Sequence, residues 1–171
     1  MKRRIVIIGL DGVPYELIKE LSEKGVMPST REIIEGGIFK KMRSCLPEVS
    51  CVAWSSIITG KNPAEHGIFG YTDLAANSYE LRFSNFCDLK AIPFWELLPS
   101  RSVIINVPAT YPVRKINGVH ISGFVSVDIK KSVYPPLVFW LGFKDTLADN
   151  TRSFKGKGGL LSDAQEVSNI S

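Results

Sequence analysis

The stretch Arg4-Ile5-Val6-Ile7-Ile8-Gly9-Leu10-Asp11-Gly12 carries the clearest fold signal of the chain. Its continuous apolar run, rich in β-branched residues, is typical of a strand covered on both faces in a parallel sheet. The run is too short for the apolar core of a secretory signal, and no small-residue cleavage site follows it. It is therefore interpreted as a buried strand that ends in a turn at Asp11-Gly12.

Two helix signals follow this turn. The first helix is expected to begin near Pro14 and to end before Gly25. The second is expected to have Ser29 or Thr30 as its cap and to end at Gly36-Gly37. The apolar side chains expected to point inward are Leu17, Ile18, Leu21, Ile33 and Ile34.

Further helix and strand signals alternate along the rest of the chain. A helix is predicted over residues 51–59, directly after Ser50 and closed by Gly60, with a buried strand at 103–107 and an extended segment at 119–124. The aromatic residues interpreted as core are Trp54, Phe69, Phe94 and Trp95. This alternation predicts an α/β fold with helices on the faces of a mostly parallel sheet.

Length and composition favour one globular domain. The chain has 171 residues, of which 44% are hydrophobic and 22% charged, so it can bury a core. We expect this domain to span residues 1–140. Residues 141–171 are expected to form an irregular or disordered tail, because they are polar and include a Gly156-Lys157-Gly158-Gly159 cluster.

Charge and cysteine usage exclude several classes of protein. The net charge is +4, but the basic residues are scattered and no nucleic-acid motif accompanies them, so no nucleic-acid partner is expected. No apolar stretch is long enough to span a membrane. The three cysteines show no CxxC spacing, which favours reduced, largely buried thiols. A cytoplasmic protein without a membrane partner is the expectation.

Asp11 and Ser50 are the residues with the clearest chemical potential. A carboxylate at the end of a strand can hold a divalent cation, although Asp-Gly is also a common turn pair. Ser50 is expected at the N-cap of its helix, where backbone N–H groups favour a phosphoryl group, although simple capping also explains a serine there. His66 and His120 have no metal-ligand spacing and are interpreted as hydrogen-bonded structural residues.

The joint pattern of motifs is more specific than any single residue. The segments that carry it are Gly9-Leu10-Asp11-Gly12, Gly25-Val26-Met27-Pro28, the block from Leu46 to Ile68, Pro93-Phe94-Trp95-Glu96, Ile105-Asn106-Val107-Pro108-Ala109-Thr110-Tyr111-Pro112, Asn117-Gly118-Val119 and Ser122-Gly123-Phe124. Together they resemble the type I phosphodiesterase and nucleotide pyrophosphatase family of the alkaline phosphatase superfamily. The resemblance covers roughly residues 4 to 136 and implies a three-layer α/β/α, alkaline phosphatase-like fold.

The resemblance also implies roles for particular residues. Asp11 corresponds to the first metal-binding aspartate, and Ser50 to the nucleophile, which also binds the metal. The implied chemistry is hydrolysis of a phosphodiester or pyrophosphate bond in a small phosphate ester, through a phosphoseryl intermediate and with two divalent metal ions, zinc or else manganese. Tyr71 stands where the nucleotide pyrophosphatase branch has a phosphate-binding asparagine, so it is the candidate substrate-binding residue.

The family's remaining metal ligands, in an Asp-x-x-x-His segment, an Asp-His-Gly segment and a later histidine, have no counterpart here. We therefore expect a truncated or degenerate member with an incomplete metal site, and self-association through surface left uncovered by truncation. Whether the chain is itself an enzyme stays open. The alternatives are a non-catalytic member or a phosphotransferase of the same superfamily, whereas a sulfatase is disfavoured because Cys51 lacks the Cys-x-Pro-x-Arg context.

Overall fold

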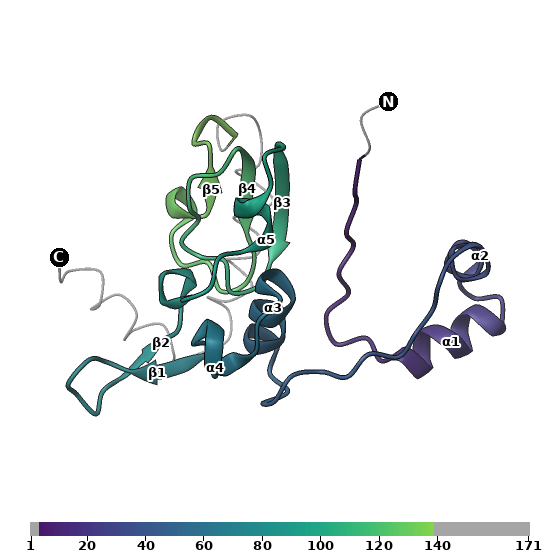
Figure 1. The fold of residues 1–171 in the computed structure, drawn as a ribbon, viewed down its shortest axis with the longest axis horizontal. Coiled ribbons are helices and arrows are strands. Elements are labelled where there is room, and N and C mark those ends of the chain that lie inside the picture. Colours follow the sequence, from purple (N-terminus) through teal and green to yellow (C-terminus); the bar gives the residue numbers. More distant parts are fainter. Residues whose placement is uncertain (1–3, 139–171) are drawn as a thin grey trace, which may run out of the picture. The chain divides into compact units, whose positions relative to one another are not determined.

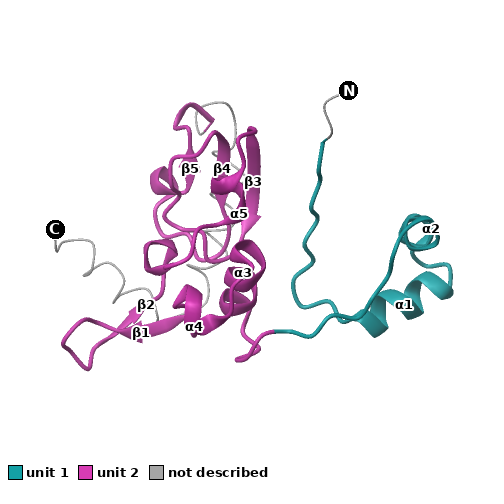
Figure 2. Ribbon diagram, viewed as in Figure 1, with its two compact units in different colours: residues 1–44 teal, residues 45–171 magenta. Residues whose placement is uncertain are grey.

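The computed structural model describes residues 4–138 of the chain. The chain forms two compact units, residues 1–44 (unit 1) and residues 45–171 (unit 2), shown in Figures 1 and 2. None of the helices in the described part of the chain has the length and apolar character needed to span a bilayer. Residues 139–171, which include the predicted tail, lie outside the described residues.

Unit 1 contains two helices, α1 (Tyr15–Glu23) and α2 (Pro28–Gly36), as the sequence predicted. Pro14 is the N-cap of α1, and the chain turns after this helix at Gly25, whose φ of +72° suits glycine. The predicted cap of α2 is wrong, because the helix already begins at Pro28. A proline is favourable at the first helical position, where its missing N–H has no intrahelical role.

Residues 4–10, the predicted first strand, form no strand. Within the part of the chain that the structure describes, both sheets are built from other residues. The apolar side chains of this segment are exposed, with Ile5 at 85% and Ile8 at 81% of full exposure. A strand is held by hydrogen bonds to a neighbouring strand, and residues 4–10 pair with no strand among the described residues. The prediction of a buried strand is therefore wrong for this structure.

The helices of unit 1 bury little apolar surface. The rings of Tyr15 and Phe39 stack with centroids 4.4 Å apart, which joins α1 to the segment that follows α2. The inward orientation predicted for Ile33 is wrong, since this side chain is exposed, and Leu17 is exposed as well. The ion pairs of this unit, such as Arg31–Glu35 and Lys41–Glu16, lie at the surface, where water screens them, so they contribute little to stability.

Unit 2 contains the sheet that the sequence predicted in part. Its described elements are α3 (Ser50–Thr59), α4 (Pro63–His66), β1 (Thr72–Leu74), β2 (Leu81–Phe83), η1 (Phe86–Asp88), α5 (Phe94–Leu97), β3 (Ser102–Val107), β4 (Gly118–Ser122), η2 (Ile129–Lys131) and β5 (Val133–Tyr134). β4 lies between β3, which is parallel to it, and β5, which is antiparallel. β1 and β2 form a separate antiparallel hairpin that was not predicted. The fold is therefore mixed α/β (Figure 1).

Strand β3 is covered on one face only. Ile104 is buried, whereas Val103 and Ile105 on the other face are 66% and 57% exposed. The prediction of a fully buried strand at 103–107 is thus wrong for one of its two faces. Val103 and Ile105 project from the face opposite to Ile104, because successive side chains of a strand alternate between faces.

Two glycines allow the close approach of backbone segments around β3 and β4. A Cβ atom at Gly118 would lie 1.8 Å from the carbonyl oxygen of Ser102, where β4 begins beside β3. A Cβ atom at Gly123 would lie 2.6 Å from the carbonyl oxygen of Val107, where both strands end. Both ends of the parallel pair therefore depend on the absence of a side chain.

The core of unit 2 joins α3 to the sheet. Its buried apolar residues are Cys51, Val52, Ile58, Ile68, Phe86, Leu89, Trp95 and Ile104. The guanidinium of Arg114 lies 4.3 Å from the ring centroid of Phe86 and donates a hydrogen bond to the Phe86 carbonyl at 2.6 Å. Of the aromatic residues predicted to be core, Trp95 is buried, but Phe69 is exposed and the prediction is wrong there.

Replacement of Phe86 by alanine should lower the free energy of unfolding by about 3–5 kcal/mol, because it empties a fully buried site and removes the ring beneath Arg114. Urea denaturation of the full chain measures this change. Phe83→Ala removes the same side chain from an exposed position of β2, and it should change the free energy by no more than about 0.5 kcal/mol. Equal losses in the two variants would contradict the assignment of Phe86 to the core.

Candidate functional site

Ser50 is the first residue of α3, whereas the sequence predicted it to be the cap of this helix. Val49 is the N-cap, and its carbonyl accepts hydrogen bonds from the N–H groups of Val52 and Ala53 at 3.0 and 2.9 Å. The cap prediction is wrong by one residue, since the backbone of Ser50 is already helical. Its side chain is partly exposed at the start of a ten-residue helix.

The burial of α3 fixes where Ser50 lies in unit 2. Val52 and Ile58 are buried in the core, whereas Ile57 is exposed. Gly60 ends the helix in the left-handed conformation and donates its N–H to the Ser56 carbonyl at 2.8 Å. The N-terminal end of such a helix carries a partial positive charge, which favours a bound anion near Ser50.

Cys51, the neighbour of Ser50, is unsuited to act as a nucleophile. It is only 3% exposed, and burial raises the pKa of its thiol above the ordinary value, so less thiolate is present. All three cysteines are free thiols. The prediction of largely buried thiols holds for Cys51 but is wrong for Cys87, which is exposed, and Cys45 is half-buried.

Asp11 lies in a turn of unit 1 and is exposed. Gly12, which follows it, has a φ of +66°, as expected for the predicted Asp-Gly turn. Ser50 and Tyr71 belong to unit 2. The sharing of one metal site by Asp11 and Ser50 therefore stays a prediction.

Tyr71 lies immediately before β1 and is partly exposed. Its carbonyl accepts a hydrogen bond from the N–H of Ser84 at 2.8 Å, and its ring meets that of Phe124 edge to face with centroids 6.4 Å apart. Phe124 lies two residues beyond the carboxyl end of β4, the side of an α/β sheet on which ligands collect. The sequence did not indicate the contact with Phe124, because nothing in the local pattern relates two residues so far apart.

His66 is a hydrogen-bonded structural residue, as predicted. Its Nδ1 accepts a hydrogen bond from the N–H of Ile68 at 3.1 Å, so the ring proton lies on Nε2 and is donated to the Ser56 hydroxyl at 3.0 Å. Burial lowers the pKa of His66 below its ordinary value, which keeps the ring neutral near pH 7. In this tautomer the ring joins α4 to α3 and cannot take a proton from Ser56.

His120 lies in β4, as predicted, but the hydrogen bonds predicted for it are absent. The residue is fully buried, and neither of its ring nitrogens has a hydrogen-bond partner. Its ring is instead surrounded by the aromatic side chains of Phe86 and Trp95. The interpretation of His120 as a hydrogen-bonded residue is therefore wrong.

The described residues do not by themselves fit a dinuclear metal centre. Across residues 4–138 no three side chains of histidine, cysteine, aspartate or glutamate come together in a way that could hold a metal ion. Each cation of such a pair needs several protein ligands. Asp11 and Ser50 can supply two of them.

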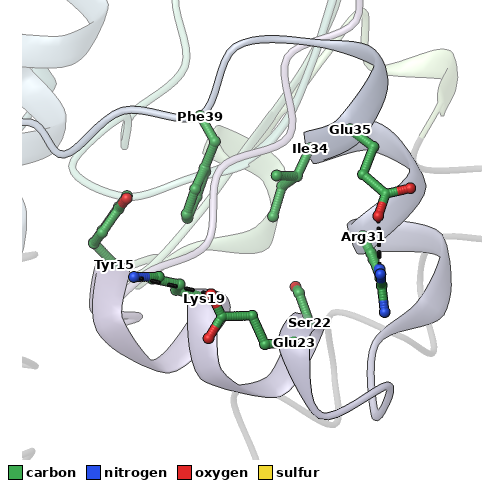
Figure 3. Close-up of a pocket in the computed structure, with 8 residues that line it drawn as sticks. All are labelled: Tyr15, Lys19, Ser22, Glu23, Arg31, Ile34, Glu35 and Phe39. Atoms are coloured by element: carbon green, nitrogen blue, oxygen red, sulfur yellow. Dashed lines mark hydrogen bonds and ion pairs between the residues drawn. The ribbon is translucent and has the colours of Figure 1, made fainter.

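A hollow of about 320 Å³ lies in unit 1 between α1 and α2 (Figure 3). It is lined by Tyr15, Lys19, Ser22, Glu23, Arg31, Ile34, Glu35 and Phe39. Its charged residues pair with each other four positions apart along each helix, and none of the residues predicted to be functional lines it. Because its charges are already paired and it contains neither Asp11 nor Ser50, the hollow is not the candidate active site.

Comparison with known proteins agrees with the motifs of the sequence. The model of the family described as type I phosphodiesterase / nucleotide pyrophosphatase matches residues 5–145. The matched range contains Asp11, Ser50 and Tyr71. No match to a curated protein or to a solved structure was found.

Replacement of Ser56 by alanine should lower the free energy of unfolding by about 1–3 kcal/mol, because it leaves the buried Nε2–H of His66 without an acceptor. Urea denaturation gives the change. Ser78→Ala, which removes a hydroxyl that accepts a hydrogen bond in an exposed turn, should change the value by less than about 0.5 kcal/mol. An ¹⁵N spectrum of the histidine rings that shows the proton of His66 on Nδ1 would contradict this assignment.

Proposed function

Because the chain belongs to the type I phosphodiesterase / nucleotide pyrophosphatase family, we propose that it serves the hydrolysis of phosphodiester or pyrophosphate bonds in a small phosphate ester. The family match extends over residues 5–145. The observation that carries the proposal is the position of Ser50, a partly exposed hydroxyl on the first residue of α3 within that match.

Ser50 is the proposed nucleophile. Its oxygen attacks phosphorus in line and forms the new oxygen–phosphorus bond, while the bond to the leaving group breaks and the leaving oxygen takes up a proton. Water then attacks the phosphoseryl intermediate, releases the phosphate product and restores the serine hydroxyl. The start of α3 supports this role, because the helix dipole stabilises negative charge on the transferred group.

Metal ions are part of the proposal. The family is typically metal-dependent. We propose that Asp11 and Ser50 supply ligands to two divalent cations, zinc or else manganese, and that the site is complete only when groups from outside this chain supply the others. Such cations, when bound, make a hydroxyl more acidic and neutralise charge on the phosphoryl group.

The same reasoning extends to the fold and to substrate binding. The parallel pair β3–β4 supports a central sheet of the three-layer, alkaline phosphatase-like kind. Tyr71 is the proposed phosphate-binding residue, since a phenol can donate a hydrogen bond to a phosphate oxygen. Its contact with Phe124 at the carboxyl end of β4 supports this assignment.

A non-catalytic member of the family is the second candidate. It is favoured by one observation, the lack of any cluster of three metal-ligating side chains in residues 4–138. In that case the chain keeps the fold as a binding or assembly module.

Phosphoryl transfer to a second hydroxyl differs from hydrolysis only in the acceptor, and a product analysis with added alcohol distinguishes the two reactions.

We expect the purified chain to hydrolyse bis-p-nitrophenyl phosphate no faster than its Ser50→Ala variant, with zinc or manganese added, because two ligands are too few for a dinuclear site. The release of p-nitrophenol from both proteins, with each metal and with a chelator, measures this. Ser100→Ala, an exposed serine outside the candidate site, is the matched control.

Two other outcomes of this experiment are informative. A metal-dependent rate that Ser50→Ala loses would establish Ser50 as the nucleophile and contradict the incomplete metal site. A metal-dependent rate that Ser50→Ala retains would contradict the assignment of the nucleophile.

The exposed apolar residues lead us to propose that the chain self-associates. In unit 2, Val103 and Ile105 lie exposed on β3, which is an edge strand among the described residues. Ile105→Lys should shift sedimentation velocity profiles toward the monomer, because a charge at an edge opposes strand pairing. Ser100→Lys adds the same charge at an exposed position before the strand and should have little effect. A monomeric parent chain at micromolar concentration would contradict the proposal.

A further inference from the structure

His120 occupies the centre of the three-stranded sheet of unit 2. It lies on β4, opposite Ile104 of β3 and Tyr134 of β5, and its side chain is 0% exposed. The backbone on both sides of it is hydrogen-bonded into the sheet. The imidazole therefore cannot reach water without a change in the packing of this sheet.

The environment of the imidazole is apolar and has no hydrogen-bonding group directed at it. The rings of Phe86 and Trp95 meet it edge to face, with centroids 5.8 and 5.9 Å away. Both ring nitrogens of His120 and the Nε1 of Trp95 are buried without hydrogen-bond partners. A charge on this ring would have neither water nor an acceptor to stabilise it.

The nearby charges also oppose a proton on His120. Arg114, whose guanidinium covers Phe86, acts on His120 as a like charge. The carboxylates of the adjoining elements are already paired: Glu96 of α5 lies 3.8 Å from Arg114, and Asp88 of η1 lies 2.7 Å from Arg82. β3 contributes the uncharged Ile104, and β5 contributes the phenol of Tyr134.

We propose that His120 is an acid-sensitive switch, in which uptake of a proton by the buried ring breaks the packing of β4 on η1 and α5 and opens unit 2. His66 is buried too, but its ring nitrogens are both hydrogen-bonded. His120 has no such contacts to keep. A protonated His120 ring is therefore stabilised only when the sheet opens and water reaches it.

The direction of the effect follows from proton linkage. Burial and, to a smaller degree, Arg114 lower the pKa of His120 from 6.5 to about 4 in the folded chain. The unfolded chain then binds the proton more tightly, so stability is complete above pH 6.5 and is lost as the pH falls from 6.5 toward 4. At pH 5 this difference raises the equilibrium constant for unfolding by about 30-fold over its value at pH 7.5.

Unfolding in urea at pH 7.5 and pH 5 tests the proposal with the full chain. In the parent chain, the equilibrium constant for unfolding should rise between pH 7.5 and pH 5 by about 30-fold more than it does in His120→Leu. His120→Leu keeps an apolar side chain among the same aromatic rings, so it should fold. His66→Gln, which removes the other histidine of the chain, is the matched control. It should still show the rise of about 30-fold in the unfolding equilibrium constant that His120 causes.

A nuclear magnetic resonance titration of the parent chain gives an independent reading, even if a variant fails to fold. The chain has two histidines, so His66→Gln assigns both ring signals. The His120 signal should stay at its neutral position in the folded chain and take the protonated position only as the chain unfolds. Titration of folded His120 near pH 6.5, or an equal pH dependence of unfolding in His120→Leu and the parent, would overturn the proposal.

Discussion

The parallel pairing of β3 with β4 is the constraint on which the rest of unit 2 depends. It sets Ile104 and His120 side by side on the face that is buried against Phe86 and Trp95. Arg114 in turn contacts the Phe86 ring and donates a hydrogen bond to the Phe86 carbonyl. A slip of one residue between these strands would turn the buried residues outward, because successive side chains alternate between the faces of a sheet.

The same core determines how the candidate nucleophile is held. Val52 and Ile58 fix α3 in the cluster that contains Phe86 and Ile104, so Ser50 is carried on a rigid helix rather than on a loop. This arrangement suits a nucleophile, which needs a constant position relative to the group it attacks. It also means that damage to the core, even far from Ser50, disturbs the position of its hydroxyl.

Local rules were sufficient for part of this structure. Helices α1 and α3 were predicted from apolar spacing and a terminal glycine, β3 from its apolar run, and β4 as an extended segment after the Asn117-Gly118 turn. Strand pairing and side-chain contacts between residues far apart in the chain could not be predicted from the sequence. Residues 4–10 have the composition of a buried strand but pair with no strand among the residues that the structure describes, and the contact between Tyr71 and Phe124 links separate parts of the chain. The family motifs identified Ser50, while its place within the helix depended on the backbone of Val49.

The tight backbone contacts at Gly118 and Gly123 have an evolutionary consequence. Each glycine stands where even a methyl group would collide with a carbonyl oxygen of β3, so the main chain itself leaves no room for adaptation by neighbouring side chains. As sequences related to this one diverge, these two positions should remain glycine. Their five-residue spacing offers a signature for recognising this sheet in distant relatives that have lost every catalytic residue.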